Sequence, residues 1–520
     1  MLAGPPGTGQ ALDVRPPTLF VLAALLAGCA PEPSSSGSGH GVLVIAIDAL
    51  RSDHVSVYGY DRPTMPRLEK LADEGVVFLE AWAAAPELVA SHASILTGCD
   101  PTIARRPPLP DGTQLSESVA WQIPSEVPRL AREFLAAGYS TAAFVDDPML
   151  SPVYGFDGGF ETFTGYRADA RTKKESGFTA VGEKFLRWLQ EVDASGEWFA
   201  YLHANDLESV WSDPSPDPRV ITYFEARPEL QHVPPVAESD EVFFAVPRKR
   251  WEYGGILSLG EYEARYDGTM RRLNDGISRL FAHLRRQGRW ETTTVLVVGT
   301  YGFGFGESGL ILESGTLSDV DLHVPCILRP APAFETERGL RTPHLVSLLD
   351  LAPTLLDLAG LDVPRGMGGI SHLGTLLGGR EPAREVAFAS GGLQDGFAAI
   401  DERWIFERSA PGSRRPGPLV ESWYGEYVPD RVEYRTFLKD RHAGATLGNL
   451  GDSAEDDEAI TRLSEAGTVW IRAAERARDA LHKVPWARKE LSPEELNELR
   501  RRGIVPPGAE AIDSAQSPGW

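Results

Sequence analysis

The end of one long apolar run carries a side chain that could do chemistry. Residues Val42–Ile47 are all apolar, and Asp48 follows them directly. In open α/β sheets, ligands bind beyond the carboxyl ends of buried strands, which is where this carboxylate would lie. A carboxylate there could ligate a divalent cation. Asp48 is therefore a candidate metal ligand, and the interpretation we favour slightly is a strand-end carboxylate that caps the next turn.

Two histidines and a serine are further candidates. Ser91 and His92 are adjacent, and His203 follows the apolar segment 198–202. Adjacent residues cannot place an imidazole against a hydroxyl in the usual nucleophile–base geometry, so we expect Ser91 to cap the helix that carries Ile95. His203 is interpreted as a core histidine in preference to a ligand. A cluster of four acids could bind a cation by a separate route, although a solvated face is more common: Glu307, Glu313, Asp319 and Asp321.

The elements that would position these residues alternate between buried strands and amphipathic helices. Apolar runs recur at 198–202 and 294–298, and between 262 and 284 apolar residues are spaced alternately by four and three. This alternation predicts an α/β fold with a mostly parallel sheet sandwiched by helices. Beyond residue 378, short apolar segments separated by turn signals predict a smaller C-terminal antiparallel subdomain over 379–485. A polar tail over 486–520 is expected to be disordered.

Composition limits the classes of partner. The 520-residue chain carries 51 basic and 74 acidic residues, a formal net charge of −23. Nucleic-acid phosphates are neutralised by clustered Lys and Arg, so this balance argues against a nucleic-acid partner. Two of the three cysteines, Cys99 and Cys326, could pair in an oxidising compartment, but buried free thiols are the preferred interpretation.

The N-terminus has the pattern of a targeting segment. A short apolar run ends in Leu26-Ala27-Gly28-Cys29, which resembles the bacterial lipobox. The resemblance implies a signal peptide at 1–28, lipidation of Cys29 and a flexible tether within 29–40, in a protein anchored to a membrane of the cell envelope. Ala30 favours the outer membrane, facing the periplasm or the surface. The alternative is an ordinary signal peptide in which Cys29 is incidental.

Several motifs resemble the sulfatase family of the alkaline-phosphatase superfamily. They follow the family's order from 41 to 378, and include Arg51-Ser52-Asp53-His54, Ser91-His92-Ala93-Ser94, Gly306-Glu307-Ser308-Gly309 and Asp350-Leu351-Ala352-Pro353-Thr354. The resemblance implies the family's α/β domain over 41–378. It also implies descent from sulfuric ester hydrolases, which use calcium or another divalent cation and a formylglycine nucleophile made from Cys or Ser.

Position by position, the resemblance makes Asp48 the first metal carboxylate and retains His92 and His203. Counting back from Leu96-Thr97-Gly98 places the nucleophile at Leu88, an aliphatic side chain that can neither attack an ester nor become formylglycine.

The far side of the family's metal site is also replaced. Thr300-Tyr301 stands where the family has Asp-His or Asp-Asn, and Glu208 stands where it has an imidazole. Glu313 occupies the place of a Lys or His. A lone carboxylate holds a divalent cation weakly, since such ions take about six oxygen ligands. We therefore expect a degenerate site with no confident catalytic residue and no confident cofactor.

The sequence thus predicts an envelope lipoprotein of sulfatase fold that has lost ester hydrolysis. One alternative is an active metal-dependent hydrolase of sulfate or phosphate esters with a rearranged site. Another is a binding module that uses the old cleft for a sulfated glycan or an envelope protein.

Overall fold

An eight-stranded sheet carries the residues of interest. The computed structural model describes residues 39–105, 121–165, 177–209, 223–231, 233, 257–307, 310–332, 334, 336–379, 384–391, 396–408, 415–416, 431–432, 436–441 and 454–481. The predicted signal peptide, Cys29 and the 486–520 tail lie outside these residues. The strand order is β10 (Leu340–Ser347), β2 (Val76–Trp82), β9 (Cys326–Arg329), β6 (Thr293–Gly299), β1 (Gly41–Ile47), β5 (Trp198–Ala204), β3 (Ser140–Phe144) and β4 (Thr162–Thr164).

Most of this sheet is parallel, as predicted. Strand β9 runs antiparallel to β2 and β6, and the other neighbouring pairs are parallel. Strand β1 lies in the middle, and its side chains alternate between two hydrophobic clusters. Val42, Val44 and Ala46 belong to one cluster, and Leu43, Ile45 and Ile47 to the other. Because β1 is buried on both faces, its sequence is continuously apolar.

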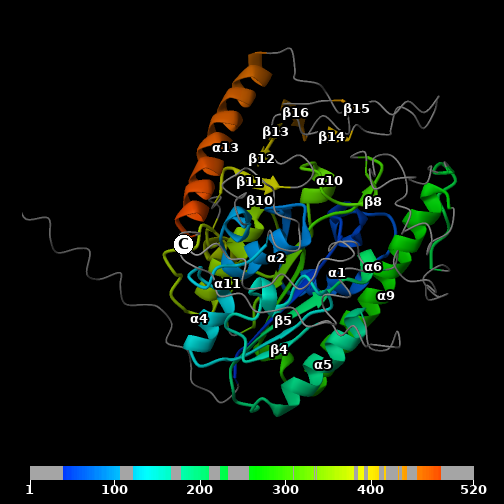
Figure 1. Cartoon of the computed structure of the whole chain (residues 1–520). Helices are drawn as coiled ribbons and strands as arrows, with labels where there is room; N and C mark the ends of the chain where they lie inside the picture. Colours follow the sequence, from blue (N-terminus) through cyan, green and yellow to red (C-terminus); the bar gives the residue numbers. More distant parts are fainter. Residues whose placement is uncertain are drawn as a thin grey trace, which may run out of the picture. The chain divides into compact units, whose positions relative to one another are not determined.

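Helices cover both faces of the sheet (Figure 1), and their apolar side chains complete the two clusters. On one face lie α1 (Pro66–Glu74), α5 (Gly177–Glu191) and α9 (Leu259–Arg286). On the other lie α2 (Leu88–Thr97), α4 (Leu130–Ala136) and α11 (Leu351–Leu358). The stripe predicted between 262 and 284 is confirmed by α9, whose N-terminus is fixed by a capping box between Ser258 and Glu261. The predicted α/β fold is therefore confirmed.

A separate antiparallel sheet follows in the C-terminal region. Its order is β11 (Ala387–Gly391), β12 (Gly396–Ile400), β13 (Trp404–Arg408) and β16 (Thr436–Asp440), and α13 (Ala454–Leu481) packs against it. Lys439 pairs with Asp319 of the larger domain at 2.7 Å, and Arg441 pairs with Glu80. These ion pairs link the small antiparallel sheet to Asp319 and to strand β2 of the large sheet. The predicted domain boundaries stay predictions.

Short elements complete the described chain. The remaining helices are α6 (Asp206–Ser209), α10 (Asp319–Leu322) and α12 (Leu373–Leu376), with 3₁₀ turns at Ser52–His54, Ser56–Tyr58, Pro101–Ala104, Pro152–Tyr154, Trp290–Thr292 and Leu348–Asp350. Two small ribbons pair β7 (Gly304–Phe305) with β8 (Ile311–Glu313), and β14 (Arg415–Pro416) with β15 (Arg431–Val432). Among the described residues, no helix combines the length and apolarity needed to cross a membrane.

Candidate functional site

The carboxyl ends of three adjacent strands bring distant residues together. Asp48 follows β1, His203 is the penultimate residue of β5, and Thr300 follows β6. The parallel register aligns these ends, since Ala46 lies opposite His203 and Ile47 lies opposite Gly299. The three residues therefore meet at one edge of the sheet, where the sequence had placed Asp48.

The carboxylate of Asp48 accepts hydrogen bonds from three side chains. His92 Nε2 lies 2.8 Å from Oδ1, His203 Nε2 lies 2.7 Å from Oδ2, and the Thr300 hydroxyl donates to Oδ1 at 2.6 Å. All four residues are fully buried. Burial alone would raise the pKa of Asp48, but the two imidazoles hold that pKa well below its usual range. The prediction that Asp48 caps the next turn is wrong: its carboxylate bonds to His92, His203 and Thr300, and the 3₁₀ turn Ser52–His54 has no side-chain cap.

The turn after Asp48 is strained. Ala49 has a φ of 56°, a left-handed conformation that L-residues other than glycine adopt at a cost of about 1 kcal/mol. The Tyr266 hydroxyl on α9 donates to the Ala49 carbonyl at 2.6 Å and accepts from the Arg51 amide at 3.1 Å. These bonds hold the turn, and with it Asp48, in position.

Asp48, His92 and His203 bring potential ligand atoms within 4.8 Å of one another, but this set does not fit calcium. Calcium takes six to eight oxygen ligands, whereas Asp48 faces two imidazoles and one hydroxyl. A metal-bound histidine normally donates through its other ring nitrogen. Here Nδ1 of His203 accepts from the Asp146 amide at 3.1 Å, so the hydrogen-bond network assigns the ring proton to Nε2, which points at Asp48. That nitrogen has no lone pair for a metal.

Helix α2 brings the expected nucleophile position to the same place. Leu88 is the first residue of α2, and His92 lies one turn later on the same face. Leu88 is half-buried and packs against both hydrophobic clusters. The expectation that Ser91 caps this helix is wrong: the helix begins three residues earlier, and the Ser91 hydroxyl donates to the Thr300 carbonyl inside the fold.

Two replaced positions contact each other. The hydroxyl of Tyr301 donates to Glu208 Oε2 at 2.8 Å. Tyr301 is buried, and burial together with nearby carboxylates raises its pKa well above the usual value, so the phenol keeps its proton. Sequence reasoning singled out both positions as lost ligands but missed their pairing, because 93 residues separate them.

The four acids near residue 310 do not form a shared site. Glu307 pairs with Arg51 at 2.8 Å, and Asp319 pairs with Lys439. Asp321 is fully buried and accepts from Thr316, so the solvated-face interpretation is wrong for this residue. None of the four belongs to a described group of three potential metal ligands.

A second such group was not anticipated from the sequence. His54, Glu263 and Asp267 offer ligand atoms within 4.8 Å of one another, between the loop after β1 and helix α9. Arg62 contacts Asp267 at 2.8 Å and Arg227 contacts Glu263 at 3.0 Å. Because two guanidinium groups already lie against these carboxylates, we interpret this group as an ion-pair network.

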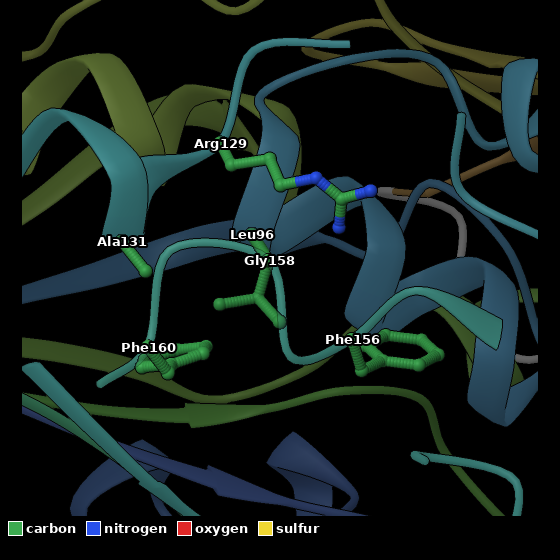
Figure 2. A pocket seen from close by; sticks show the side chains of 6 residues that line it. All are labelled: Leu96, Arg129, Ala131, Phe156, Gly158 and Phe160. Atoms are coloured by element: carbon green, nitrogen blue, oxygen red, sulfur yellow. The ribbon is translucent and has the colours of Figure 1, made fainter. Parts of the chain in front are cut away.

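A small cavity lies beside α2 and α4. Figure 2 shows its lining side chains, which are Leu96, Arg129, Ala131, Phe156, Gly158 and Phe160. Its volume is about 10 Å³, near the minimum for one water molecule, so it cannot hold a substrate. Arg129 serves the backbone instead: its guanidinium donates to the carbonyls of Ile123 and Pro124 at 3.0 and 3.1 Å.

The two described cysteines take no part in this chemistry. Cys99 and Cys326 are buried and free, which confirms the prediction. Burial raises the pKa of the Cys99 thiol to about 11, so the reactive thiolate is disfavoured.

Comparisons with known proteins agree on one family. The family model described as Sulfatase matches residues 40–361. An arylsulfatase from Clostridium perfringens is 25% identical over 381 residues, covering 64% of this chain and 77% of that protein. An N-acetylglucosamine-6-O-sulfatase from Bacteroides thetaiotaomicron is 22% identical over 432 residues, covering 69% of this chain and 75% of that protein.

Solved structures share the fold. A phosphonate monoester hydrolase of Agrobacterium radiobacter superposes with a TM-score of 0.64 at 18% identity, covering 84% of this chain and 96% of that one. A 2-O GAG sulfatase superposes with a TM-score of 0.61 at 17% identity, covering 88% and 97%. At this level of identity, the likeness concerns the fold alone.

Proposed function

This chain belongs to the sulfatase family, and on that premise we propose that it is an exported, lipid-anchored member that no longer hydrolyses esters. The single observation that carries the proposal is Leu88 at the first position of α2, one turn before His92. The resemblance aligns this position with the family's nucleophile. An aliphatic side chain has no lone pair with which to attack sulfur or phosphorus.

Loss of the nucleophile is expected to lower the rate of ester hydrolysis by a large factor. Removing the nucleophile or its base from an enzyme that relies on a catalytic triad costs about 10⁶-fold in rate. The Asp48 carboxylate, which would bind the family's cation, already accepts three hydrogen bonds from the protein. Loss of the nucleophile and loss of the electrophilic cation are separate defects, and both act against turnover.

The retained role that we propose is binding in the cell envelope. The lipobox-like sequence ending at Cys29 supports a lipid anchor, and Ala30 supports the outer membrane. Relatives named for sulfatases of N-acetylglucosamine and hexuronate support a sulfated glycan as the ligand class, with an envelope protein as the other candidate.

Turnover assays test the loss of activity directly. Protein lacking residues 1–29 is incubated with aryl sulfate and aryl phosphate esters in the presence of calcium, magnesium or manganese. We expect rates equal to the buffer background, and the same rates for Asp48→Asn. Turnover by the unmodified protein that disappears in Asp48→Asn would contradict the proposal and favour a rearranged hydrolase site.

Anchoring is tested in cells. The full chain and a Cys29→Ala variant are expressed in a bacterium with a lipoprotein-processing pathway, and the membrane and soluble fractions are compared. We expect the full chain in the outer-membrane fraction. The variant should leave that fraction or retain its signal peptide; equal membrane association of a processed variant would refute lipidation.

A further inference from the structure

The loss of a nucleophile does not explain how the buried carboxylate of Asp48 is stabilised. We infer that hydrogen bonds from His92, His203 and Thr300 stabilise this carboxylate within the protein, and that this sulfatase-family fold is consequently stable without a divalent cation. The inference is independent of the proposed loss of hydrolysis, since a protein can lack turnover and still bind a cation.

Both oxygens of Asp48 are engaged by donors. Oδ1 accepts from His92 Nε2 and from the Thr300 hydroxyl, and Oδ2 accepts from His203 Nε2, at 2.6–2.8 Å. The single Thr300 hydroxyl proton goes to Asp48, because the alternative acceptor, the Ile47 carbonyl, lies farther away at 3.3 Å. Hydrogen bonds to an ionised acceptor are roughly twice as strong as neutral ones, which is the compensation that a buried carboxylate needs.

Both imidazole rings are fixed from their other side. His203 Nδ1 accepts from the Asp146 amide at 3.1 Å, and His92 Nδ1 lies 2.7 Å from the buried hydroxyl of Tyr201. The ring planes of His92 and His203 stand at 82° with centroids 5.0 Å apart, so the two rings approach the carboxylate from different directions. Each ring is therefore positioned by the fold to donate to Asp48.

Thr300 links this arrangement to the replaced half of the family's site. A carboxylate or amide oxygen at position 300 would be an additional ligand for a cation. Threonine instead adds no negative charge at this position, and it donates its hydroxyl proton to the Asp48 carboxylate. The substitution thus changes position 300 from a partner of the metal to a partner of the carboxylate.

The two models predict different responses of Asp48→Asn. If hydrogen bonds from the protein stabilise Asp48, the amide N–H of the asparagine either faces the Nε2–H of His203 or replaces the bond from His92. The variant then loses stability in calcium and in chelator alike. With a cation, the variant loses only the stability that calcium gives, since a ligand stabilises the folded state in proportion to its occupancy.

The experiment measures metal content and thermal unfolding of protein lacking residues 1–29. Metal content is determined by elemental mass spectrometry, and melting is followed with excess EDTA, calcium, magnesium, manganese or zinc. We expect substoichiometric metal and the same Tm in every condition. Asp48→Asn should lower Tm equally with EDTA and with calcium.

Two substitutions of Thr300 provide a matched pair that keeps the test decisive if Asp48→Asn does not fold. Thr300→Ser retains the hydroxyl and should keep the melting temperature close to that of the unmodified protein. Thr300→Val is nearly isosteric but removes the donor, so it should melt several degrees lower regardless of calcium. The inference would be overturned by about one bound cation per chain together with a Tm that falls in EDTA only when Asp48 is present. Equal melting temperatures of the two Thr300 variants would also overturn it.

Discussion

Asp321, on the short helix α10, is predicted to make the protein more stable at acidic than at alkaline pH. Its Oδ2 accepts from the Gly315 amide at 3.1 Å and from the Thr316 amide and hydroxyl, both at 2.7 Å. Its Oδ1 is buried and has no hydrogen-bond partner among the described residues. Burial raises the pKa of this carboxyl to about 7, more than the three donors lower it.

The sign of the pH dependence follows from proton binding. The unfolded chain releases this proton near pH 4, whereas the folded protein holds it up to about pH 7. Between these values the folded state binds more protons, so the free energy of unfolding falls as pH rises. A shift of about three pKa units corresponds to at most ~4 kcal/mol, reached above pH 7.

Asp321→Asn removes this ionisation. The amide oxygen can accept the three hydrogen bonds, and the amide nitrogen takes the position of the unpartnered Oδ1. We expect the variant to gain up to ~4 kcal/mol over the unmodified protein at alkaline pH and little at pH values below the unfolded pKa.

Urea unfolding across this pH range is the assay. Asp319→Asn, on the same helix, is the matched control, because its half-exposed ion pair with Lys439 contributes about 0–1 kcal/mol. If the stabilities of Asp321→Asn and the unmodified protein stay parallel from acidic to alkaline pH, the buried-acid reasoning is refuted.

Three further predictions concern contacts around the site and the sheet. Tyr301→Phe should lower the free energy of unfolding by about 1.5–3 kcal/mol, and a double-mutant cycle with Glu208→Gln should show coupling; additive losses would mean that their hydrogen bond contributes nothing. Burial would raise the pKa of Asp350, but Arg384 and other donors hold it at about 2. This carboxylate therefore adds stability above its unfolded pKa, and that stability is lost as pH falls from about 4 to about 2. Arg384→Met should move the midpoint of acid unfolding to higher pH, and an unchanged midpoint would disprove the contribution. Gly302→Ala should destabilise the protein severely in thermal melts, because a β-carbon there would lie 1.8 Å from a backbone carbonyl oxygen, and a near-normal Tm would show that the turn can move.

The sequence predicted the parts of the fold that local pattern encodes. The apolar run at 42–47 became β1, the run at 294–298 lies within β6, and the stripe from 262 to 284 became α9. Each signal is a periodicity within one segment, and burial on one or both faces produces it directly. Asp48 and His203 could be singled out for the same reason, since each lies at or near the end of an apolar strand.

The partners within the site could not be predicted from one sequence. The bond from His92 to Asp48 spans 44 residues and that from His203 spans 155, and neither spacing carries a local signature. Ser91 was misassigned because its type favours helix caps, while the helix in fact begins at Leu88. In both cases, long-range strand pairing determined which side chains meet.

The bond between Tyr301 and Glu208 has a consequence for substitutions at either position. A substitution at position 208 or at position 301 alone would break this buried hydrogen bond, and the new side chain would have to bond in its place. The residues at these two positions are therefore coupled, and a substitution at one changes the hydrogen bonding of the other.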